Sequence, residues 1–280
     1  MDLLRRVFPI PAVAVLLTAL GFTCVGTHAA SMGEARYVDV DGIQTRYFEA
    51  GTGEAMVLIH AGQWGSAASS ATGWMPIFPS LAAHFHVYAV DIPGSDVEHL
   101  QRFIETLGID QVHLVGHARG ALPGARIPMD HPELVKTLTL FDSNTVASGE
   151  PPPPPPPGAN TRSRPSSGRF SPTPEDEEWN RRVTDRIRQR LRSSISTFQE
   201  DYSAIKAGGL KTPTLIIWGF NEPSGTTQPY RLGLALFEMI SNSVDQAQLH
   251  FFNQAGTAPY RDHPGEVTHL MVSFIGRVKN

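Results

Sequence analysis

Short apolar runs alternate along most of this sequence with segments whose apolar residues recur every three or four positions. Runs bounded by turn residues are typical of buried strands, and the longer repeat is typical of amphipathic helices. Strands of this kind are predicted at residues 56–59, 86–90, 112–115, 135–141, 214–218 and 248–252. Because strands and helices alternate, the pattern indicates an α/β fold with a mostly parallel sheet covered on both faces.

The first two predicted strands differ from the rest because apolar and polar residues are interleaved in them. They cover residues 36–40 and 45–49 and are joined through Asp41-Gly42. An Asp-Gly pair between alternating stretches is a strong signal for a tight β-hairpin. We therefore expect an antiparallel hairpin at the start of the sheet.

Helices are predicted where the apolar residues fall on one face. The expected ranges are 74–83, 97–107, 121–130, 230–240 and a last helix that begins at His263-Pro264. Pro128 lacks a backbone N–H, so the helix that contains it should end or kink there.

Composition changes sharply after residue 146, where prolines 151–157 are surrounded by Ser, Arg and Gly. Seven prolines form a stiff rod of roughly 20 Å at about 3.1 Å per residue, which suits a spacer or a ligand for a proline-reading module. A helix is predicted to restart at Thr173-Pro174-Glu175-Asp176, because Thr is a good N-cap and Pro suits the first helical position. The apolar stripe that follows, from Trp179 to Phe198, indicates a helix that packs on another surface.

Residues 1–29 resemble a secretory leader, with Arg5 and Arg6 before an apolar stretch and small residues at its end. This pattern predicts a secreted or periplasmic protein, and an uncleaved membrane anchor is the alternative. Cys24, the single cysteine, lies inside this leader, so no disulfide is expected in the mature chain.

The remaining composition limits the partners. The net charge of the 280 residues is −4 and no long basic run is present, so nucleic acid is not an expected partner. The sequence has neither metal-ligand spacing nor a glycine-rich phosphate loop, so we expect no metal and no cofactor. It gives no information on oligomeric state.

The most informative motif is Gly116-His117-Ala118-Arg119-Gly120, between a predicted strand and a predicted helix. This is the context of a nucleophile elbow, in which glycine two places on either side of the nucleophile permits tight backbone packing. The central position is normally Ser, Cys or Asp, but here it is Ala118, whose methyl group cannot attack a carbonyl.

In order along the chain, the elbow is accompanied by four further segments: His60-Ala61-Gly62, Asp91-Ile92-Pro93-Gly94, residues 218–222 and Gly256-Thr257. Together they resemble the α/β-hydrolase superfamily over residues 36–278, and within it the meta-cleavage-product hydrolases, which break carbon–carbon bonds. With the leader predicted above at 1–29, the resemblance implies a hydrolase core in two parts (30–145 and 209–280) and, between them, a helical cap that contains the proline-rich linker (146–208).

The resemblance also assigns site positions. Ala118 is at the nucleophile position, Glu222 at the acid position and Thr257 at the position of the histidine base. The oxyanion loop corresponds to the three residues that follow the first parallel strand, and the elbow contributes one backbone amide to the same hole. These oxyanion and pocket residues are His60, Ala61, Gly62 and Arg119.

Loss of both nucleophile and base predicts a protein that is inactive by the standard route, because losing either group alone lowers kcat about a million-fold. His117, Asp142 and His263 are the residues considered as replacements. Their simpler interpretations are a packed histidine beside the elbow, a turn residue after a strand and a surface histidine at a helix start.

Three functions remain open at this point. The first is a degenerate hydrolase that binds a small apolar or aromatic molecule. The second is an active hydrolase of ester or carbon–carbon bonds that uses divergent residues. The third is a secreted interaction protein whose contact surface includes prolines 151–157.

Overall fold

The computed structural model describes residues 32–61, 70–92, 96–148, 173–176, 198–220 and 230–278. The predicted leader, prolines 151–157 and the apolar stripe that begins at Trp179 lie outside these ranges. No helix in the described ranges is long and apolar enough to cross a membrane.

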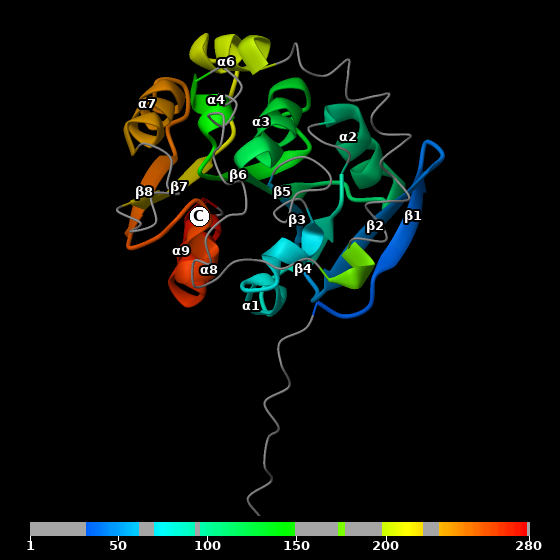
Figure 1. The fold of residues 1–280 in the computed structure, drawn as a ribbon. Helices are drawn as coiled ribbons and strands as arrows, with labels where there is room; N and C mark the ends of the chain where they lie inside the picture. The colour runs from blue at the N-terminus through cyan, green and yellow to red at the C-terminus, as the bar shows by residue number, and fades with distance from the viewer. Residues whose placement is uncertain are drawn as a thin grey trace, which may run out of the picture.

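The core of the fold is one sheet of eight strands in the order β1-β2-β4-β3-β5-β6-β7-β8 (Figure 1). β1 and β2 pair antiparallel, β2 also runs antiparallel to β4, and all later pairs are parallel. The strands are β1 (Arg36–Val40), β2 (Ile43–Ala50), β3 (Ala55–Ile59), β4 (His86–Val90), β5 (Val112–His117), β6 (Val135–Phe141), β7 (Thr214–Phe220) and β8 (Ala247–Asn253). The predicted mostly parallel sheet is thereby confirmed.

The hairpin between β1 and β2 has the turn that the sequence predicted. Asp41 and Gly42 both have positive φ, 51° and 78°. Two successive residues with positive φ form the turn type whose twist matches that of the paired strands.

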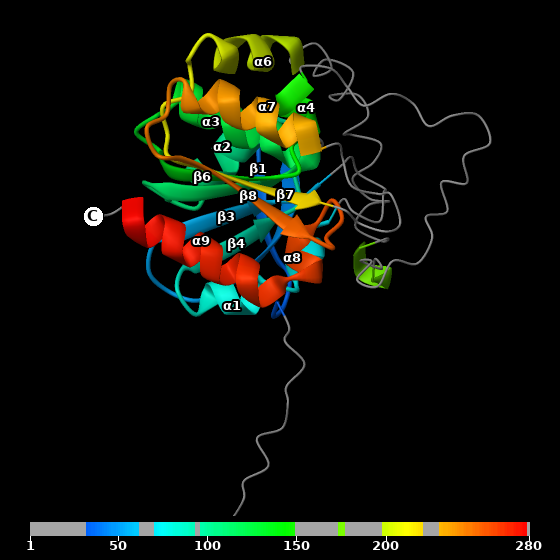
Figure 2. The same cartoon turned by 90° about the vertical axis from the view of Figure 1, so that its left-hand side faces the viewer.

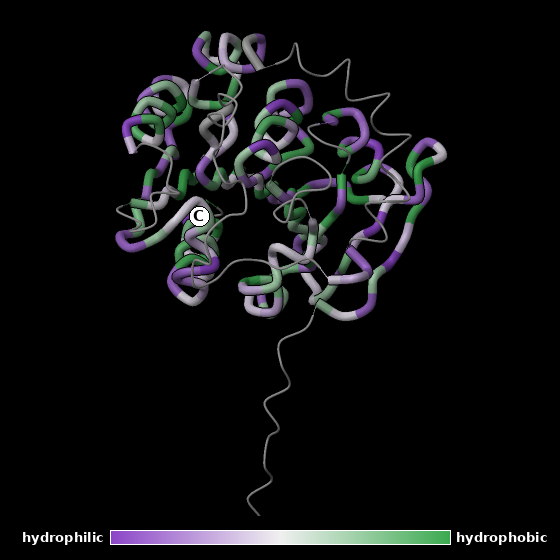
Figure 3. Tube along the Cα trace, in the orientation of Figure 1, coloured by the Kyte–Doolittle hydropathy of each residue, from purple (hydrophilic) through white to green (hydrophobic). Residues whose placement is uncertain are grey.

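Helices cover both faces of the sheet (Figure 2). One layer contains α2 (Val97–Thr106), α3 (Ala121–Asp130), α4 (Asn144–Ser148), α6 (Phe198–Lys206) and α7 (Tyr230–Ser241). The other contains α1 (Phe78–Ala82), α8 (Pro259–Asp262) and α9 (Pro264–Val278). Each layer seals its own apolar cluster against the strands, and the hydrophobic positions accordingly follow the strands and the inward sides of the helices (Figure 3).

The prediction of one helix over residues 74–83 is wrong. The structure has a 3-10 turn, η1 (Ala71–Trp74), and a separate five-residue helix, α1. Pro76 and Pro79 fall in this stretch, and each removes a backbone donor that a continuous helix would need. α3, by contrast, continues through Pro128 and ends two residues later at Asp130.

The helix predicted to begin at Thr173 has the expected start. The backbone N–H of Asp176 donates to Oγ1 of Thr173 at 3.1 Å, and the N–H of Thr173 donates to Oδ2 of Asp176 at 2.8 Å. This reciprocal pair is the capping-box arrangement. α6, from the end of the range assigned to the cap, packs on the core, where Ile205 is fully buried.

Candidate active site

The carboxyl ends of the parallel strands meet at one edge of the sheet, and the elbow lies in the middle of that edge. β5 ends at His117 and leads through a short 3-10 turn, η2 (Ala118–Gly120), directly into α3. A β-carbon at Gly116 would lie 2.6 Å from the carbonyl oxygen of Gly120. One at Gly120 would lie 2.5 Å from the carbonyl oxygen of His60. Both glycines are therefore required by close backbone contact, as the motif predicts.

Ala118 has a φ of 49°, the left-handed conformation that L side chains rarely adopt. Its methyl group is half-exposed at the edge of the sheet. The backbone therefore has the strained turn of a nucleophile elbow, while the side chain has no group that can form a bond to substrate.

The oxyanion-loop residues lie against this turn, as the contact between Gly120 and the carbonyl of His60 shows. His60 is buried, and its Nε2 accepts a hydrogen bond of 3.2 Å from the backbone N–H of Ile92. With Nε2 as acceptor, Nδ1 carries the proton and faces the carbonyl oxygen of Ala61 at 3.3 Å. Burial lowers the pKa of His60, so the ring is neutral and fixes the ends of β3 and β4. Gly62 lies outside the described residues.

The side chain of His117, a candidate replacement base, packs among aromatic rings. Its Nδ1 shares a hydrogen bond of 3.1 Å with the hydroxyl of Tyr260, and its ring meets those of Tyr260 and Trp74 edge-on. Burial, with the nearby charge of Arg261, lowers the pKa of His117 to about 3. A ring with so weak an affinity for protons, held among aromatic side chains, is a packing residue.

The loop after β8 lies beside the elbow. A β-carbon at Gly219 would clash with the carbonyl oxygens of Ala255 and Gly256, which places this loop on the end of β7. The backbone of Thr257 reaches the ring of His117, and its side chain is half-exposed. The structure thus brings Ala118 and Thr257, the predicted nucleophile and base positions, to one edge. Glu222, at the acid position, lies outside the described residues.

The other two candidate replacements occupy defined positions. Asp142 is buried directly after β6 with a φ of 43°, and its N–H donates to the carbonyl of Ile217. His263 shares a hydrogen bond of 3.1 Å with the carbonyl oxygen of Asn253 and packs on Phe252, so it supports the loop after β8.

This arrangement of strands, elbow and loops agrees with the family comparison. A model described as the alpha/beta hydrolase family matches residues 56–270. The chain belongs to this family. The fold expected from the sequence is thereby confirmed.

Curated relatives narrow the resemblance. A 2-hydroxy-6-oxo-6-(2'-aminophenyl)hexa-2,4-dienoic acid hydrolase from Metapseudomonas resinovorans is 37% identical over 123 residues. That match covers 39% of this chain and about two fifths (42%) of the relative's length. A 2-hydroxy-6-oxononadienedioate/2-hydroxy-6-oxononatrienedioate hydrolase from Burkholderia vietnamiensis is 25% identical, and the match covers 91% of this chain and 99% of the relative.

Solved structures show the same fold. A serine hydrolase of carbazole degradation, CarC, superposes with a TM-score of 0.60 at 22% identity, covering 87% of this chain and 98% of its own. The meta-cleavage product hydrolase CumD superposes with a TM-score of 0.57 at 21% identity, covering 86% of this chain and 98% of its own. The chain is thus an α/β-hydrolase that resembles the meta-cleavage product hydrolases.

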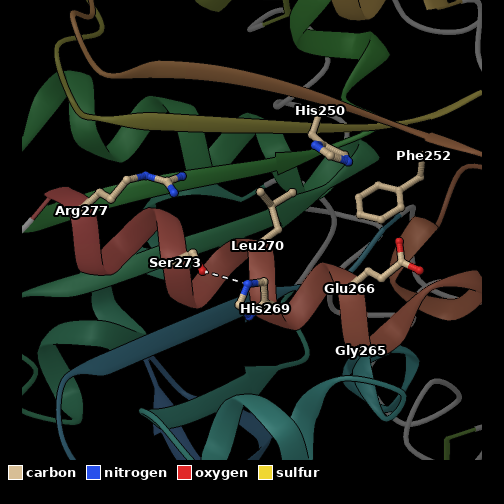
Figure 4. A pocket seen from close by; sticks show the side chains of 8 residues that line it. All are labelled: His250, Phe252, Gly265, Glu266, His269, Leu270, Ser273 and Arg277. Carbon is tan, nitrogen blue, oxygen red and sulfur yellow. Dashed lines mark hydrogen bonds between the residues drawn. The ribbon is translucent and has the colours of Figure 1, made fainter.

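A separate groove of about 490 Å³ lies between β8 and α9, away from the elbow (Figure 4). It contains Ser273 and His269, whose Oγ and Nε2 are 3.5 Å apart, with Glu266 one turn earlier on the same helix. Glu266 and His269 are exposed, and the helix binds its own N–H groups internally, so that the described residues offer Ser273 no oxyanion hole from α9.

Two features of the edge were missed from the sequence. One is the aromatic packing of Trp74, Tyr260 and Phe141 beneath the elbow. The other is a set of polar side chains, buried except for the half-buried Thr72, which we call the Arg46 cluster: Arg46, Ser70, Thr72, Asp91 and Asp176. Asp91 and Asp176 were both noted in the sequence, but only as part of a family motif and a helix start. Within the described residues, no group of three His, Cys, Asp or Glu side chains could hold a metal ion.

Proposed function

We propose that this chain is a non-hydrolytic α/β-hydrolase that binds a small apolar or aromatic molecule at the elbow without cleaving it. The observation that carries the proposal is Ala118, which occupies the strained nucleophile position with a methyl group. A serine at this position works only because a histidine takes its proton, and here Thr257 occupies the base position. Two of the three groups on which the family chemistry depends are therefore replaced by inert side chains.

The surroundings of the elbow support this proposal. His60 and His117 are the histidines closest in sequence to the oxyanion loop and the elbow, and both are buried in structural hydrogen bonds. The low pKa of His117 makes it a poor proton acceptor even where a substrate reached it. The backbone amides of Ala61 and Arg119 are the groups we assign to a carbonyl or carboxylate oxygen of the ligand.

The class of ligand follows from the relatives, whose names specify hydroxy-oxo-dienoic acids. We infer that this chain takes a molecule of the same kind, with a carboxylate, a conjugated chain and an apolar or aromatic tail. Such a ligand is strongly coloured, so its binding and its cleavage can be followed separately by absorbance.

The test compares the unmodified protein with three variants, Ala118→Ser, Thr257→His and the double variant, on a nitrophenyl ester and a 2-hydroxy-6-oxo-dienoate. We expect the unmodified protein to bind the dienoate, as measured by calorimetry, and to turn over neither substrate. Each single variant should stay near background, since nucleophile and base act as a unit. The double variant should show a gain of at least about a hundredfold, a small part of the million-fold that the pair supplies in active relatives of this mechanism.

Ala118→Gly is the matched control, because it changes the same position without adding a nucleophile. Turnover by the unmodified protein would contradict the proposal. In that case His117→Gln and Asp142→Asn would show which divergent residue is responsible.

A further inference from the structure

The Arg46 cluster holds three charged side chains in the interior beside the candidate site. Nε of Arg46 donates to Oδ2 of Asp91 at 2.6 Å, and Nη2 donates to Oδ1 of Asp176 at 2.6 Å. The side chain of Arg46 is 3% exposed, and both carboxylates are fully buried. A single guanidinium therefore joins β2, the end of β4 and the short turn at residues 173–176, which Figure 1 shows in light green beside β2 and β4.

Both carboxylates also bind the segment that leads into η1. Oδ1 of Asp91 accepts from the backbone N–H of Ala71 at 2.7 Å. On the other side, Asp176 accepts from the hydroxyl of Ser70 at 3.1 Å and from that of Thr72 at 3.0 Å. Residues 70–72 are thus held between two carboxylates that lie far apart in the sequence.

Two residues that lie next to the cluster in the sequence or in the fold make contacts in the candidate site. Ile92, which follows Asp91, donates to His60 and so fixes the oxyanion loop. Trp74, at the end of η1, stacks on Tyr260 with ring centroids 4.4 Å apart and meets the ring of His117. The residues that follow Asp91 and Thr72 in the sequence thus contact both the oxyanion loop and the packing around His117.

Stability alone gives no reason for such a cluster. Taking each ion out of water costs several kcal/mol, and apolar side chains of similar volume are often as stable as a buried ion pair or more so. Among the described residues, the two carboxylates of this cluster share one cation, Arg46, which makes the electrostatic balance less favourable still. What charged groups in fixed hydrogen bonds do supply is one definite arrangement of the backbones that carry them.

We propose that Asp176 is a positioning residue of the candidate site. Through Arg46 it ties the turn at residues 173–176, from the range that the family resemblance assigns to the cap, to the two backbone segments that flank the elbow, residues 60–61 and 70–74. The proposal rests on the proposed function only for its effect on a ligand, because the contacts themselves need none.

The test is hydrogen exchange of the full chain with Asp176→Asn, which keeps the shape and removes the charge. Exchange in peptides that cover residues 70–74 should rise about ten- to a hundredfold, the range expected when a buried hydrogen bond to a charged group is lost. Peptides from α9 should be unchanged. Glu175→Gln is the matched control, because Glu175 is the exposed neighbour in the same turn. This variant should change exchange neither at residues 70–74 nor in α9.

No difference between Asp176→Asn and Glu175→Gln would overturn the proposal, and so would an equal rise in every peptide. If Asp176→Asn does not fold, Thr72→Val decides, since it removes one hydrogen bond from Asp176 and should raise exchange at residues 70–74 to a smaller extent. An unchanged exchange rate there would overturn the proposal.

A titration with the dienoate adds the functional readout. Asp176→Asn should weaken binding about tenfold, the effect of roughly one lost positioning contact, while Glu175→Gln should leave it unchanged. If the unmodified protein does not bind the dienoate, the proposed function is contradicted, while the exchange experiment still decides the positioning role.

Discussion

The elbow at residues 116–120 and the Arg46 cluster lie at the same edge of the sheet and are held in opposite ways. The elbow requires glycine at two positions, because β-carbons at Gly116 and Gly120 would overlap the neighbouring backbone. The cluster instead requires particular side chains, since the guanidinium of Arg46 is hydrogen-bonded to the carboxylates of Asp91 and Asp176. The residues that fix the backbone of this site are therefore different from the residue at the centre of the elbow, Ala118. The strained turn of the elbow is therefore present with alanine at its centre, the residue on which the proposed loss of activity rests.

The largest effect is expected from Arg46→Met, which keeps much of the volume and removes the cation. Two buried carboxylates would lose their partner, and breaking a buried pair in this way costs about 3–5 kcal/mol of the free energy of unfolding. Urea unfolding at pH 7 measures this loss. Arg102→Met is the control, because Arg102 pairs with Glu105 on the surface, where loss of a pair changes stability by less than about 1 kcal/mol.

The stability that Arg46→Met loses should depend on pH, and the direction of that dependence can be predicted. Burial alone would raise the pKa of Asp176, but the N–H of Thr173 and the charge of Arg46 hold it below its usual value. Without Arg46, the carboxylate of Asp176 should bind a proton more readily in the folded state than in the unfolded chain, and folding then becomes more favourable as pH falls. The deficit relative to the unmodified protein should shrink between pH 7 and pH 4. A deficit that grows over this range would show that Arg46 does not compensate these charges.

A smaller loss is expected from Gly120→Ala, the corresponding change at the elbow. Its φ of −66° suits any residue, so the effect comes from overlap alone: the new methyl group would lie 2.5 Å from the carbonyl oxygen of His60. Overpacking of this kind costs about 1–3 kcal/mol. Gly265→Ala, at the start of α9, is the control, since nothing lies within 4 Å of its added β-carbon. Equal thermal unfolding of the two variants would contradict the close contact at the elbow.

The contrast between the two regions also explains what the sequence could predict. The hairpin at Asp41-Gly42 and the elbow were predicted because each depends on residues within a few positions of one another. The capping box at Thr173 is local in the same way. In the Arg46 cluster, by contrast, Arg46 lies 45 residues from Asp91 and 130 from Asp176, and no local pattern connects them.

The wrong prediction of a helix at residues 74–83 has a local cause, whereas the contact partners of His117, which was expected to be a packed residue, depend on the fold. The helix over residues 74–83 was predicted from the spacing of apolar residues. That spacing takes no account of Pro76 and Pro79, which lack the backbone N–H groups that a continuous helix needs. The packing of His117 against Tyr260 joins side chains 143 positions apart, so the orientation of that histidine required the fold. Whether Glu222 completes a site with Ala118 and Thr257 stays a prediction, because Glu222 lies outside the described residues.

The smallest effect is expected from Ala118→Gly, and its sign is opposite to that of Gly120→Ala. The left-handed conformation costs an L side chain about 1–2 kcal/mol, which glycine avoids. Glycine also loses more backbone entropy on folding, by roughly 0.5–1 kcal/mol. The net expectation is a gain of about 0.5–1 kcal/mol in the free energy of unfolding, measured by urea titration against Ala125→Gly in the interior of the following helix, which should lose at least about 1 kcal/mol. A loss at Ala118→Gly would mean that the packing of the methyl group contributes more to stability than the left-handed conformation costs.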